Sequence, residues 1–127
     1  MTIAIGTDIV EIDRIAKVYA RQREKLAVRI LTESELQRFN AMDNEAVQIA
    51  FLAKRWSAKE AIAKALGTGI AKGVGWQEME LSRDELGAPS VKLSGAAAIR
   101  WQDINGKQAL ISMSDERHYA VAFCTII

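Results

Sequence analysis

The chain of 127 residues has little cysteine, little proline and almost no net charge. Its one cysteine, Cys124, excludes an intramolecular disulfide, and the apolar residues around it predict a core position in a terminal strand. With one proline and 50% hydrophobic residues, the composition is not that of a disordered chain. Because 17 Lys and Arg face 16 Asp and Glu, attraction to an acidic partner must come from local basic clusters.

Long apolar stretches are also missing. No run approaches the roughly 18 residues that would cross a bilayer, and the N-terminal residues lack the basic start and apolar run of a signal peptide. We therefore expect no membrane association and a reducing cytoplasm as the compartment. A length of 127 residues is typical of one domain, so residues 1–127 are predicted to form a single domain.

Alternating residues and capping patterns predict the first elements. Residues 2–10 alternate in the manner of a strand, which places Asp8 at its end. Asp13 can cap a first helix that reaches residue 23 or beyond. Thr32 and Glu35 match the capping box that starts a second helix.

Residues 44–66 form the clearest predicted element. They contain strong helix formers and neither Gly nor Pro, and Gly67 follows as a C-terminal cap. Residues 67–75 then hold four glycines, which predicts a flexible loop whose backbone can approach a ligand closely.

The second half of the chain reads as short strands around one helix. Strands are predicted at residues 76–83 and 90–93, a helix from residue 94 or 95 to 104, and a hairpin of strands at 108–114 and 118–127.

Glu60 is the first residue that indicates chemistry. A helical projection of residues 44–66 places it in a stripe of otherwise apolar or small residues: Ile49, Ala53, Trp56, Ala63 and Gly67. Burying a charge without a partner costs several kcal/mol, so Glu60 should meet a metal, a cation or several donors. The alternative is an ordinary i,i+4 pair with Lys64, which would stabilise the helix by about 0.2–0.5 kcal/mol.

Asp8 has a similar ambiguity, because an aspartate at the end of a strand often only caps the following turn. Two carboxylates from separate elements, with a glycine-rich loop and lysines nearby, nevertheless suit magnesium. This ion takes few protein oxygens and keeps waters and substrate phosphates as its other ligands. The residues therefore predict a magnesium-dependent enzyme that acts on a phosphate-bearing substrate.

Four segments in order along the chain resemble one family. They are GTDIVEIDRI (residues 6–15), FLAKRWSAKEAIAKALGTGI (51–70), DELGAPSVKLSG (84–95) and SMSDERHYAVAF (112–123). Together, and above all in the W-x-x-K-E-A-x-x-K-x-x-G-x-G pattern at residues 56–69, they look like the holo-acyl-carrier-protein synthases, the small bacterial 4′-phosphopantetheinyl transferases.

The resemblance implies a fold and a reaction. The fold is α+β, the 4′-phosphopantetheinyl transferase fold, with a small antiparallel sheet packed on a long central helix and a homotrimer whose active sites lie between subunits. The reaction transfers 4′-phosphopantetheine from coenzyme A to a serine of apo-acyl carrier protein in fatty acid biosynthesis and releases adenosine 3′,5′-bisphosphate.

Site residues carry over by position. Asp8 and Glu60 match the family's Mg²⁺ ligands, and Lys64 matches the lysine that contacts the phosphates of coenzyme A. Gly67 and Gly69 match glycines near the nucleotide, although Gly67 also suits a plain helix cap. Lys59 is a weaker candidate for nucleotide contact. Either Glu60 or a metal-bound water would accept the serine proton.

Basic residues gather between positions 14 and 29. The six are Arg14, Lys17, Arg21, Arg23, Lys25 and Arg29. Such clusters are commonly just solvated, but the resemblance favours docking of the acidic helix of acyl carrier protein, with Arg14 and Arg21 at matching positions. Nucleic acid is the rival partner, and no recognised motif for it accompanies the cluster, so we expect none.

The chain differs from the family's pattern at one position, and two alternative functions are also compatible with its sequence. Many family members have a histidine where this chain has Asp115, and its only histidine, His118, comes three residues later, so no histidine role is carried over by position and His118 is left out of the site. A non-catalytic module that binds acyl carrier protein or coenzyme A would tolerate Glu60→Gln. A magnesium-dependent nucleotide hydrolase would use the same carboxylates without any carrier.

Overall fold

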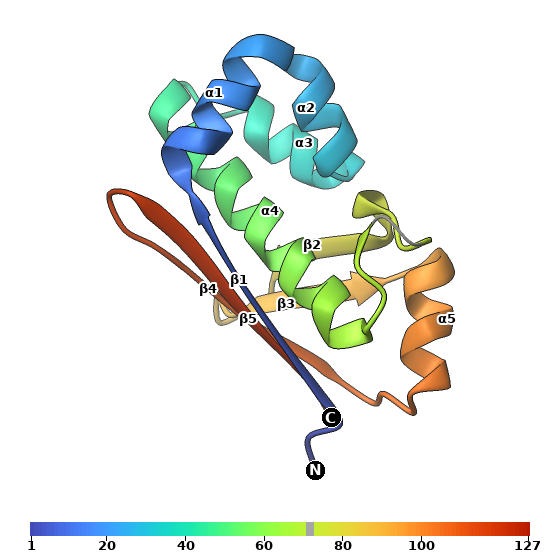
Figure 1. Cartoon of the computed structure of the whole chain (residues 1–127). Helices are drawn as coiled ribbons and strands as arrows, with labels where there is room; N and C mark the ends of the chain where they lie inside the picture. The colour runs from blue at the N-terminus through green and yellow to red at the C-terminus, as the bar shows by residue number, and fades with distance from the viewer. Residues whose placement is uncertain (71–72) are drawn as a thin grey trace.

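The structure is a computed structural model that describes residues 1–70 and 73–127 (Figure 1). Helices and strands alternate irregularly, which confirms the predicted α+β class. The helices are α1 (Ile12–Gln22), α2 (Glu24–Ile30), α3 (Glu33–Asn40), α4 (Glu45–Leu66) and α5 (Gly95–Asp103). The strands are β1 (Ala4–Glu11), β2 (Met79–Arg83), β3 (Pro89–Leu93), β4 (Ala109–Asp115) and β5 (Tyr119–Ile126). In the described part of the chain, no helix is both long and apolar enough to cross a membrane.

The strands form two antiparallel sheets. One has the order β1-β5-β4, so the predicted C-terminal hairpin of β4 and β5 is confirmed and β1 pairs along its other side. In this register Asp8 lies opposite Ala122. The other sheet consists of β2 and β3 alone.

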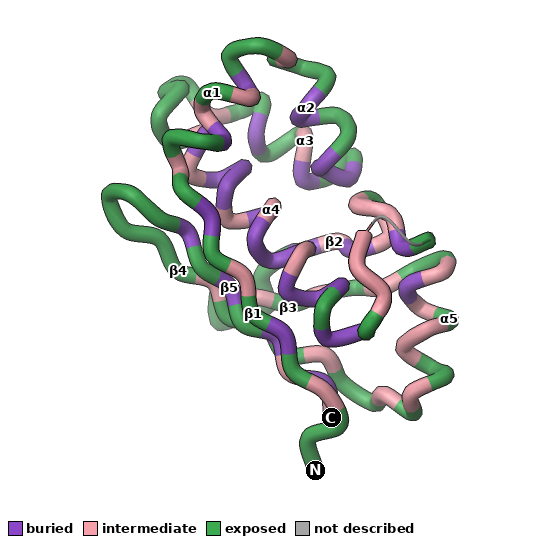
Figure 2. Tube along the Cα trace, in the orientation of Figure 1, coloured by how far each residue is buried: buried purple, intermediate pink, exposed green. Residues whose placement is uncertain are grey.

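Helix α4 runs through the middle of the fold, as predicted (Figure 1). Asn44 caps it by accepting a hydrogen bond from the backbone N–H of Val47, and Gly67 ends it in the left-handed conformation at φ 78°. Its second half packs on β1 and β5, while α1, α2 and α3 surround its first half (Figure 2).

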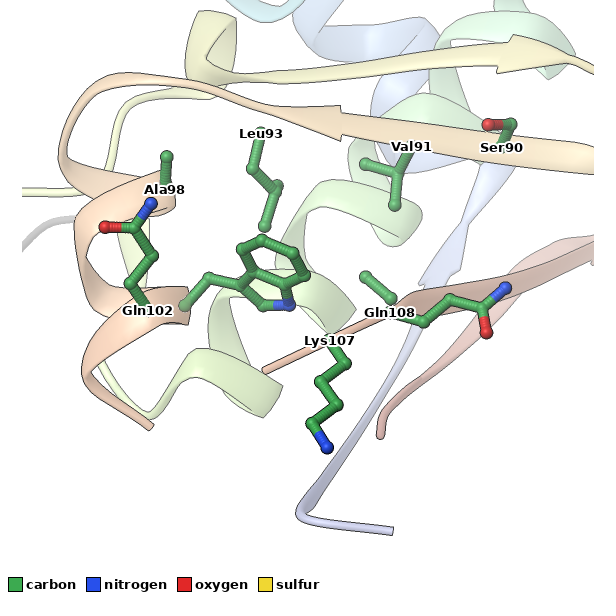
Figure 3. Close-up of a pocket in the computed structure, with 9 residues that line it drawn as sticks. Ser90, Val91, Leu93, Ala98, Gln102, Lys107 and Gln108 are labelled. Atoms are coloured by element: carbon green, nitrogen blue, oxygen red, sulfur yellow. The ribbon is translucent and has the colours of Figure 1, made fainter. Parts of the chain in front are cut away.

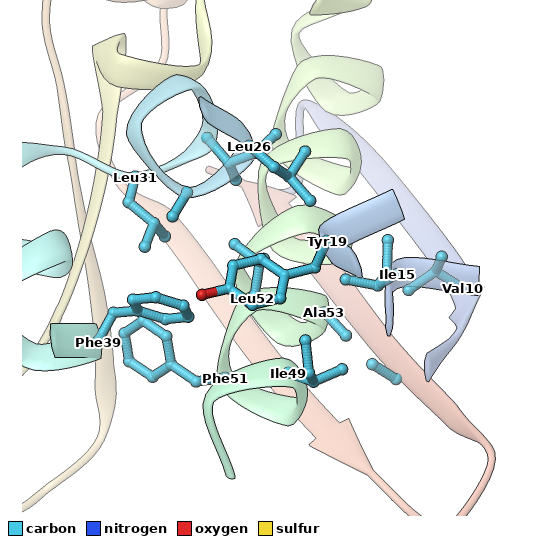
Figure 4. Close-up of a cluster of buried hydrophobic side chains, with 13 residues drawn as sticks. Val10, Ile15, Tyr19, Leu26, Leu31, Phe39, Ile49, Phe51, Leu52 and Ala53 are labelled. Carbon is cyan, nitrogen blue, oxygen red and sulfur yellow. The ribbon is translucent and has the colours of Figure 1, made fainter. Parts of the chain in front are cut away.

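Two clusters of buried side chains lie along α4. The first, shown in Figure 4, joins its N-terminal half to α1, α2 and α3, with Tyr19 against Phe39 at its centre. The second joins its C-terminal half to the sheets and α5. Cys124 is buried in the second cluster, which confirms its predicted core position.

Strand β1 presents its small residues to α4 and its isoleucines outward. Gly6 is buried against the helix: a Cβ atom there would lie 2.0 Å from the carbonyl oxygen of Ala61. Ile5 and Ile9, on the other face, are 62% and 63% exposed. The strand therefore approaches α4 at backbone distance, and it carries Asp8 on the face that meets the helix.

Several predicted boundaries were wrong. Asp8 lies three residues before the last residue of β1 rather than at its end. Asp13 does not cap α1. It lies in the first turn and pairs with Lys17 at 3.1 Å, while Glu11 holds the N-cap position. Arg23, with φ of 49°, ends α1 and separates it from α2.

The capping box of Thr32 and Glu35 is confirmed at the start of α3. The strand predicted at residues 76–83 begins only at Met79, because Trp76–Glu78 form a 3₁₀ turn.

Candidate functional site

Asp8, Glu60 and Lys64 meet where β1 crosses α4. The ammonium of Lys64 lies 3.1 Å from Oδ1 of Asp8 and donates a second hydrogen bond, of 3.0 Å, to the carbonyl of Thr7. Glu60 lies one turn before Lys64 on the same side of α4. Beside Lys64 is an open hollow of about 490 Å³, lined also by Ile5, Thr7 and Phe123.

Glu60 is half-buried and its surroundings disfavour its charge. Burial and the nearby carboxylate of Asp8 raise the pKa of Glu60, while the positive charges of Lys64 and Arg14 oppose this shift. Within residues 1–70 and 73–127, Lys64 pairs with Asp8, and Glu60 has no ion pair. The structure therefore does not show the ordinary Glu60–Lys64 helix pair.

The donor set at this site fits magnesium better than a closed structural metal site. Asp8 and Glu60 are close enough for their charges to interact. Among the described residues, no group of three or more His, Cys, Asp or Glu side chains could hold a metal. Two carboxylates leave most ligand positions to water and substrate oxygens, which is how magnesium is usually held.

The glycine-rich loop starts directly beyond this site. Gly67 and Gly69 both adopt positive φ, 78° and 65°, and nothing lies within 4 Å of a Cβ built at Gly69. Arg100 of α5 donates a 2.7 Å hydrogen bond to the carbonyl of Leu66, which anchors the end of α4. Residues 71–72, for which a flexible loop was also predicted, lie outside the described residues.

Lys59 is not placed as expected. Its side chain is fully buried, and its ammonium donates hydrogen bonds to Oε1 of Glu35 at 2.6 Å and to the carbonyl of Ile30 at 2.7 Å. Burial lowers its pKa, and the charge of Glu35 opposes the shift. A nucleotide in solvent cannot reach this ammonium, so the expected contact is not available in this structure.

Arg14 and Arg21 project from α1 and are exposed. They lie seven residues apart, which places them on one face of the helix. The guanidinium carbon of Arg14 is 5.9 Å from the centre of the Trp56 ring, and Trp56 packs against Trp76 at 5.0 Å. Because Trp56 lies one turn before Glu60 on α4, the basic face of α1 adjoins the carboxylate site.

A second cationic pocket was missed by the sequence reasoning. A pocket of about 450 Å³ is lined by the basic residues Arg38, Lys54, Arg55 and Arg83. Arg55 is only 2% exposed, its Nε has no hydrogen-bond partner among the described residues, and burial lowers its pKa to about 10. The pocket therefore gathers four basic side chains and one carboxylate, that of Asp115. The sequence did contain a signal for this pocket, because Arg55 is a charged residue in a helix that is apolar on nearly all sides. The same kind of signal identified Glu60.

Asp115 and His118, where this chain departs from the family's pattern, are not part of the Asp8 and Glu60 site. Asp115 pairs with Lys54 at 3.3 Å, near the second cationic pocket. His118 is exposed and precedes β5 rather than opening it. A further cavity of about 390 Å³ lies between β3, α5 and the start of β4 (Figure 3), and its lining includes Leu93, Trp101 and Lys107 but no carboxylate.

Comparisons with known proteins agree with one another. The model of the 4′-phosphopantetheinyl transferase superfamily matches residues 4–124. A holo-[acyl-carrier-protein] synthase of Shewanella amazonensis is 52% identical over 120 residues, which cover 94% of each chain. The crystal structure of the holo-[acyl-carrier-protein] synthase of Neisseria meningitidis has a TM-score of 0.88 and 37% identity, and the match covers 100% of this chain and 99% of that chain. That of Helicobacter pylori, in complex with coenzyme A, has a TM-score of 0.81 and 28% identity, with 97% and 99% covered.

Proposed function

The chain belongs to the 4′-phosphopantetheinyl transferase superfamily, and from that premise we propose how its residues carry out the reaction. It is an enzyme that transfers 4′-phosphopantetheine from coenzyme A to a serine of apo-acyl carrier protein and releases adenosine 3′,5′-bisphosphate. The observation that carries the proposal is the meeting of Asp8, Glu60 and Lys64 beside an open hollow.

Asp8 and Glu60 would hold a magnesium ion. The raised pKa of Glu60 supports this assignment, because a nearby cation would relieve the repulsion between the two carboxylates. When bound, magnesium neutralises negative charge on the pyrophosphate of coenzyme A and helps to orient it for in-line attack. The protein itself contributes position, because β1 and α4 fix the two carboxylates from separate elements.

Lys64 would stabilise the leaving group. The serine oxygen bonds to the phosphorus that carries the pantetheine, its proton would pass to the Glu60 carboxylate or to a water at the site, and the bond from that phosphorus to the oxygen of adenosine 3′,5′-bisphosphate breaks. Negative charge then grows on the departing phosphate. A lysine ammonium has three donors, so Lys64 can keep its contact with Asp8 while it binds a phosphate oxygen. Gly67 and Gly69 would let the nucleotide approach the backbone beyond the end of α4.

Arg14 and Arg21 would receive the acidic surface of the carrier protein. Both arginines are exposed on α1, and the contact of Arg14 with Trp56 brings this surface close to the turn of α4 that carries Glu60. A carrier docked here would present its serine near the carboxylates. Charge complementarity of this kind chiefly raises the rate of association.

A homotrimer with active sites between subunits is supported by the outer face of the β1-β5-β4 sheet. This face exposes large apolar side chains, namely Ile5, Ile9, Tyr119, Val121 and Phe123. Contiguous apolar surface of this kind usually marks an interface. Ile5 and Phe123 also line the hollow beside Lys64, so a subunit that covered the face would also wall the catalytic hollow.

One assay tests the proposed reaction. The protein is mixed with apo-acyl carrier protein, coenzyme A and magnesium, and the carrier is weighed by mass spectrometry. We expect a gain of one phosphopantetheine group, loss of this gain with a chelator, and at least a hundredfold lower rate for Asp8→Asn and Glu60→Gln. An unchanged carrier would instead indicate a binding module, and phosphate release without any carrier would indicate a hydrolase.

A further inference from the structure

Lys59 and Glu35 form a buried ion pair inside the fold. Their side chains are 0% and 1% exposed, and the ammonium lies 2.6 Å from Oε1 of Glu35. The ammonium also donates to the carbonyl of Ile30, at the end of α2. Glu35 accepts two further hydrogen bonds, both of 2.8 Å, from the backbone N–H groups of Thr32 and Leu81. The pair thus fastens α4 to α2, α3 and β2 at one point.

Stability alone does not explain such a pair. Removing two charges from water costs several kcal/mol per ion, and their mutual attraction often repays no more than this. In other proteins, apolar side chains of similar volume often stabilise such a position as well as the charges do, although here they would also leave the backbone N–H groups of Thr32 and Leu81 without an acceptor. Ala58 and Ile62 on α4 and Leu81 on β2 are buried apolar neighbours of the pair. Arg55, one turn before Lys59 on α4, is a further buried charge that interacts with both members of the pair.

The surface of α4 explains what the pair adds. The helix is buried on nearly every side of its C-terminal half, where four small side chains, Ala58, Ala61, Ala63 and Ala65, accompany the larger Ile62 and Leu66. Because apolar groups lie on every side of this half of the helix, apolar burial alone distinguishes only weakly between rotations of α4 about its axis. A directional polar contact fixes the rotation of such a helix about its axis and its position along that axis, as buried polar residues fix the register of coiled coils.

The direction of Glu60 depends on that rotation. Lys59 and Glu60 are neighbours in sequence, so their side chains leave α4 about 100° apart. We propose that the Lys59–Glu35 pair is a positioning device for the transfer site, which fixes the rotation and height of α4 so that Glu60 faces Asp8. This inference rests on the proposed magnesium site. Lys59 also binds the last residue of α2, so the same contact ties α2, which follows the proposed docking helix α1 in the chain, to the helix that carries Glu60.

The test separates positioning from stability. Three variants are compared: Lys59→Met, Glu35→Gln and the double variant Glu35→Gln/Lys59→Met, which removes both charges of the pair. Each is measured for its urea unfolding midpoint, for its kcat, and for binding of Mn²⁺ as a spectroscopic probe by electron paramagnetic resonance with coenzyme A but no carrier. We expect the double variant to recover most of the unfolding midpoint lost by Lys59→Met, yet to bind Mn²⁺ at least tenfold more weakly and to lose at least tenfold in kcat.

Two controls interpret the result. Thr32→Ala removes the side-chain cap of α3 and its bond to Glu80 but leaves the Lys59 ammonium untouched. It should lower the unfolding midpoint and leave Mn²⁺ affinity within twofold.

If Glu60→Gln binds Mn²⁺ as the wild type does, the proposed metal site is wrong. If Glu60→Gln loses Mn²⁺ while the double variant keeps it, only the positioning role is wrong. Should the double variant fail to fold, Glu35→Gln takes its place, because glutamine has the shape of glutamate and keeps one acceptor oxygen. Weaker Mn²⁺ binding by Glu35→Gln would then support the positioning role, and unchanged Mn²⁺ binding would contradict it.

Discussion

At the scale of single residues, Glu60 is held where its charge is unfavourable in the absence of a cation. Its pKa is raised above 4.5, first by burial and then by Asp8. The folded state therefore binds a proton more tightly than the unfolded state, so the free energy of unfolding falls as pH rises from about 4.5 through the raised pKa. A residue that supports catalysis should here reduce stability.

Replacing Glu60 by glutamine should expose this cost. In the metal-free protein, Glu60→Gln should have a higher urea midpoint than the wild type at neutral pH, and the difference should shrink toward pH ~4, where Glu60 becomes protonated. Urea titrations across this range measure it. Asp8→Asn is the matched comparison, since it removes one source of the raised pKa. A Glu60→Gln protein less stable than the wild type at neutral pH would contradict the prediction.

The sequence identified some residues of this site and misplaced others for a physical reason. Periodicity could show that Glu60 interrupts an apolar stripe, because that pattern is internal to one helix. It could not show that α2 and α3 cover the neighbouring side of α4, which buries Lys59 against Glu35. Partners that lie 24 residues apart are set by tertiary packing, and no local pattern records them.

At the scale of elements, the contact between β1 and α4 determines whether the two carboxylates meet. Gly6 allows it, since any Cβ would lie 2.0 Å from the carbonyl oxygen of Ala61 and 2.7 Å from the backbone nitrogen of Ala65. Both atoms belong to the helix backbone and cannot move aside as a side chain would.

Gly6→Ala should therefore push β1 away from α4. Overpacking of this kind costs about 1–3 kcal/mol, and the backbone clash places this variant at the upper end. Because Asp8 moves with the strand, transfer activity and Mn²⁺ affinity should both fall at least tenfold. Gly75→Ala is a control, because Gly75 has φ of -95° and a Cβ there would meet nothing nearer than 3.8 Å. Wild-type metal binding in Gly6→Ala would refute the close-contact argument.

Helix α1 carries the proposed docking surface, and its charge can be reversed without disturbing the core. Arg14→Glu/Arg21→Glu should raise KM for the carrier protein at least tenfold while KM for coenzyme A changes less than threefold, because the effect is on association. Steady-state kinetics at two salt concentrations measure this, and the wild-type KM for carrier should rise with salt. Lys92→Glu/Lys107→Glu makes the same change in net charge elsewhere. Equal effects on both substrates would contradict the docking role.

Some elements were predictable because their signals are local. The helix at residues 44–66, the capping box of Thr32 and Glu35 and the C-terminal hairpin each follow from neighbouring residues. The break at Arg23 was not predictable, since a non-glycine residue rarely adopts positive φ and nothing in its sequence marks it. The turn at residues 76–78 depends on the packing of Trp76 against Trp56, which is a tertiary contact.

At the scale of the whole molecule, the outer face of the β1-β5-β4 sheet is the surface that most needs a partner. The alternation of β1 was visible in the sequence, but not which side would face outward. Packing decides this, because only the small side of β1 fits against α4. The isoleucines consequently lie outside, where the proposed trimer would cover them.

A charge on this face should separate the subunits. Val121→Glu should convert a trimer to monomers in sedimentation velocity, while circular dichroism keeps the wild-type helix content. Transfer activity should fall at least tenfold, since the hollow beside Lys64 would lose its covering. Ile99→Glu, which places a charge at an exposed position on α5, should leave the mass unchanged. A Val121→Glu variant of unchanged mass, or a monomeric wild type, would refute the interface.

The pairing of β1 with β5 has a consequence for how the enzyme is made. The hydroxyl of Thr7 donates to the carbonyl of Ala122, a hydrogen bond between residues 115 positions apart in the chain. During synthesis β1 emerges first, and the strand beside it is made only after every helix. Such distant contacts form slowly. A nascent chain stalled before β5 could already have folded α4 and set Glu60, but Asp8 would lie on an unpaired strand. Activity should therefore appear only after β5 has been made and has paired with β1.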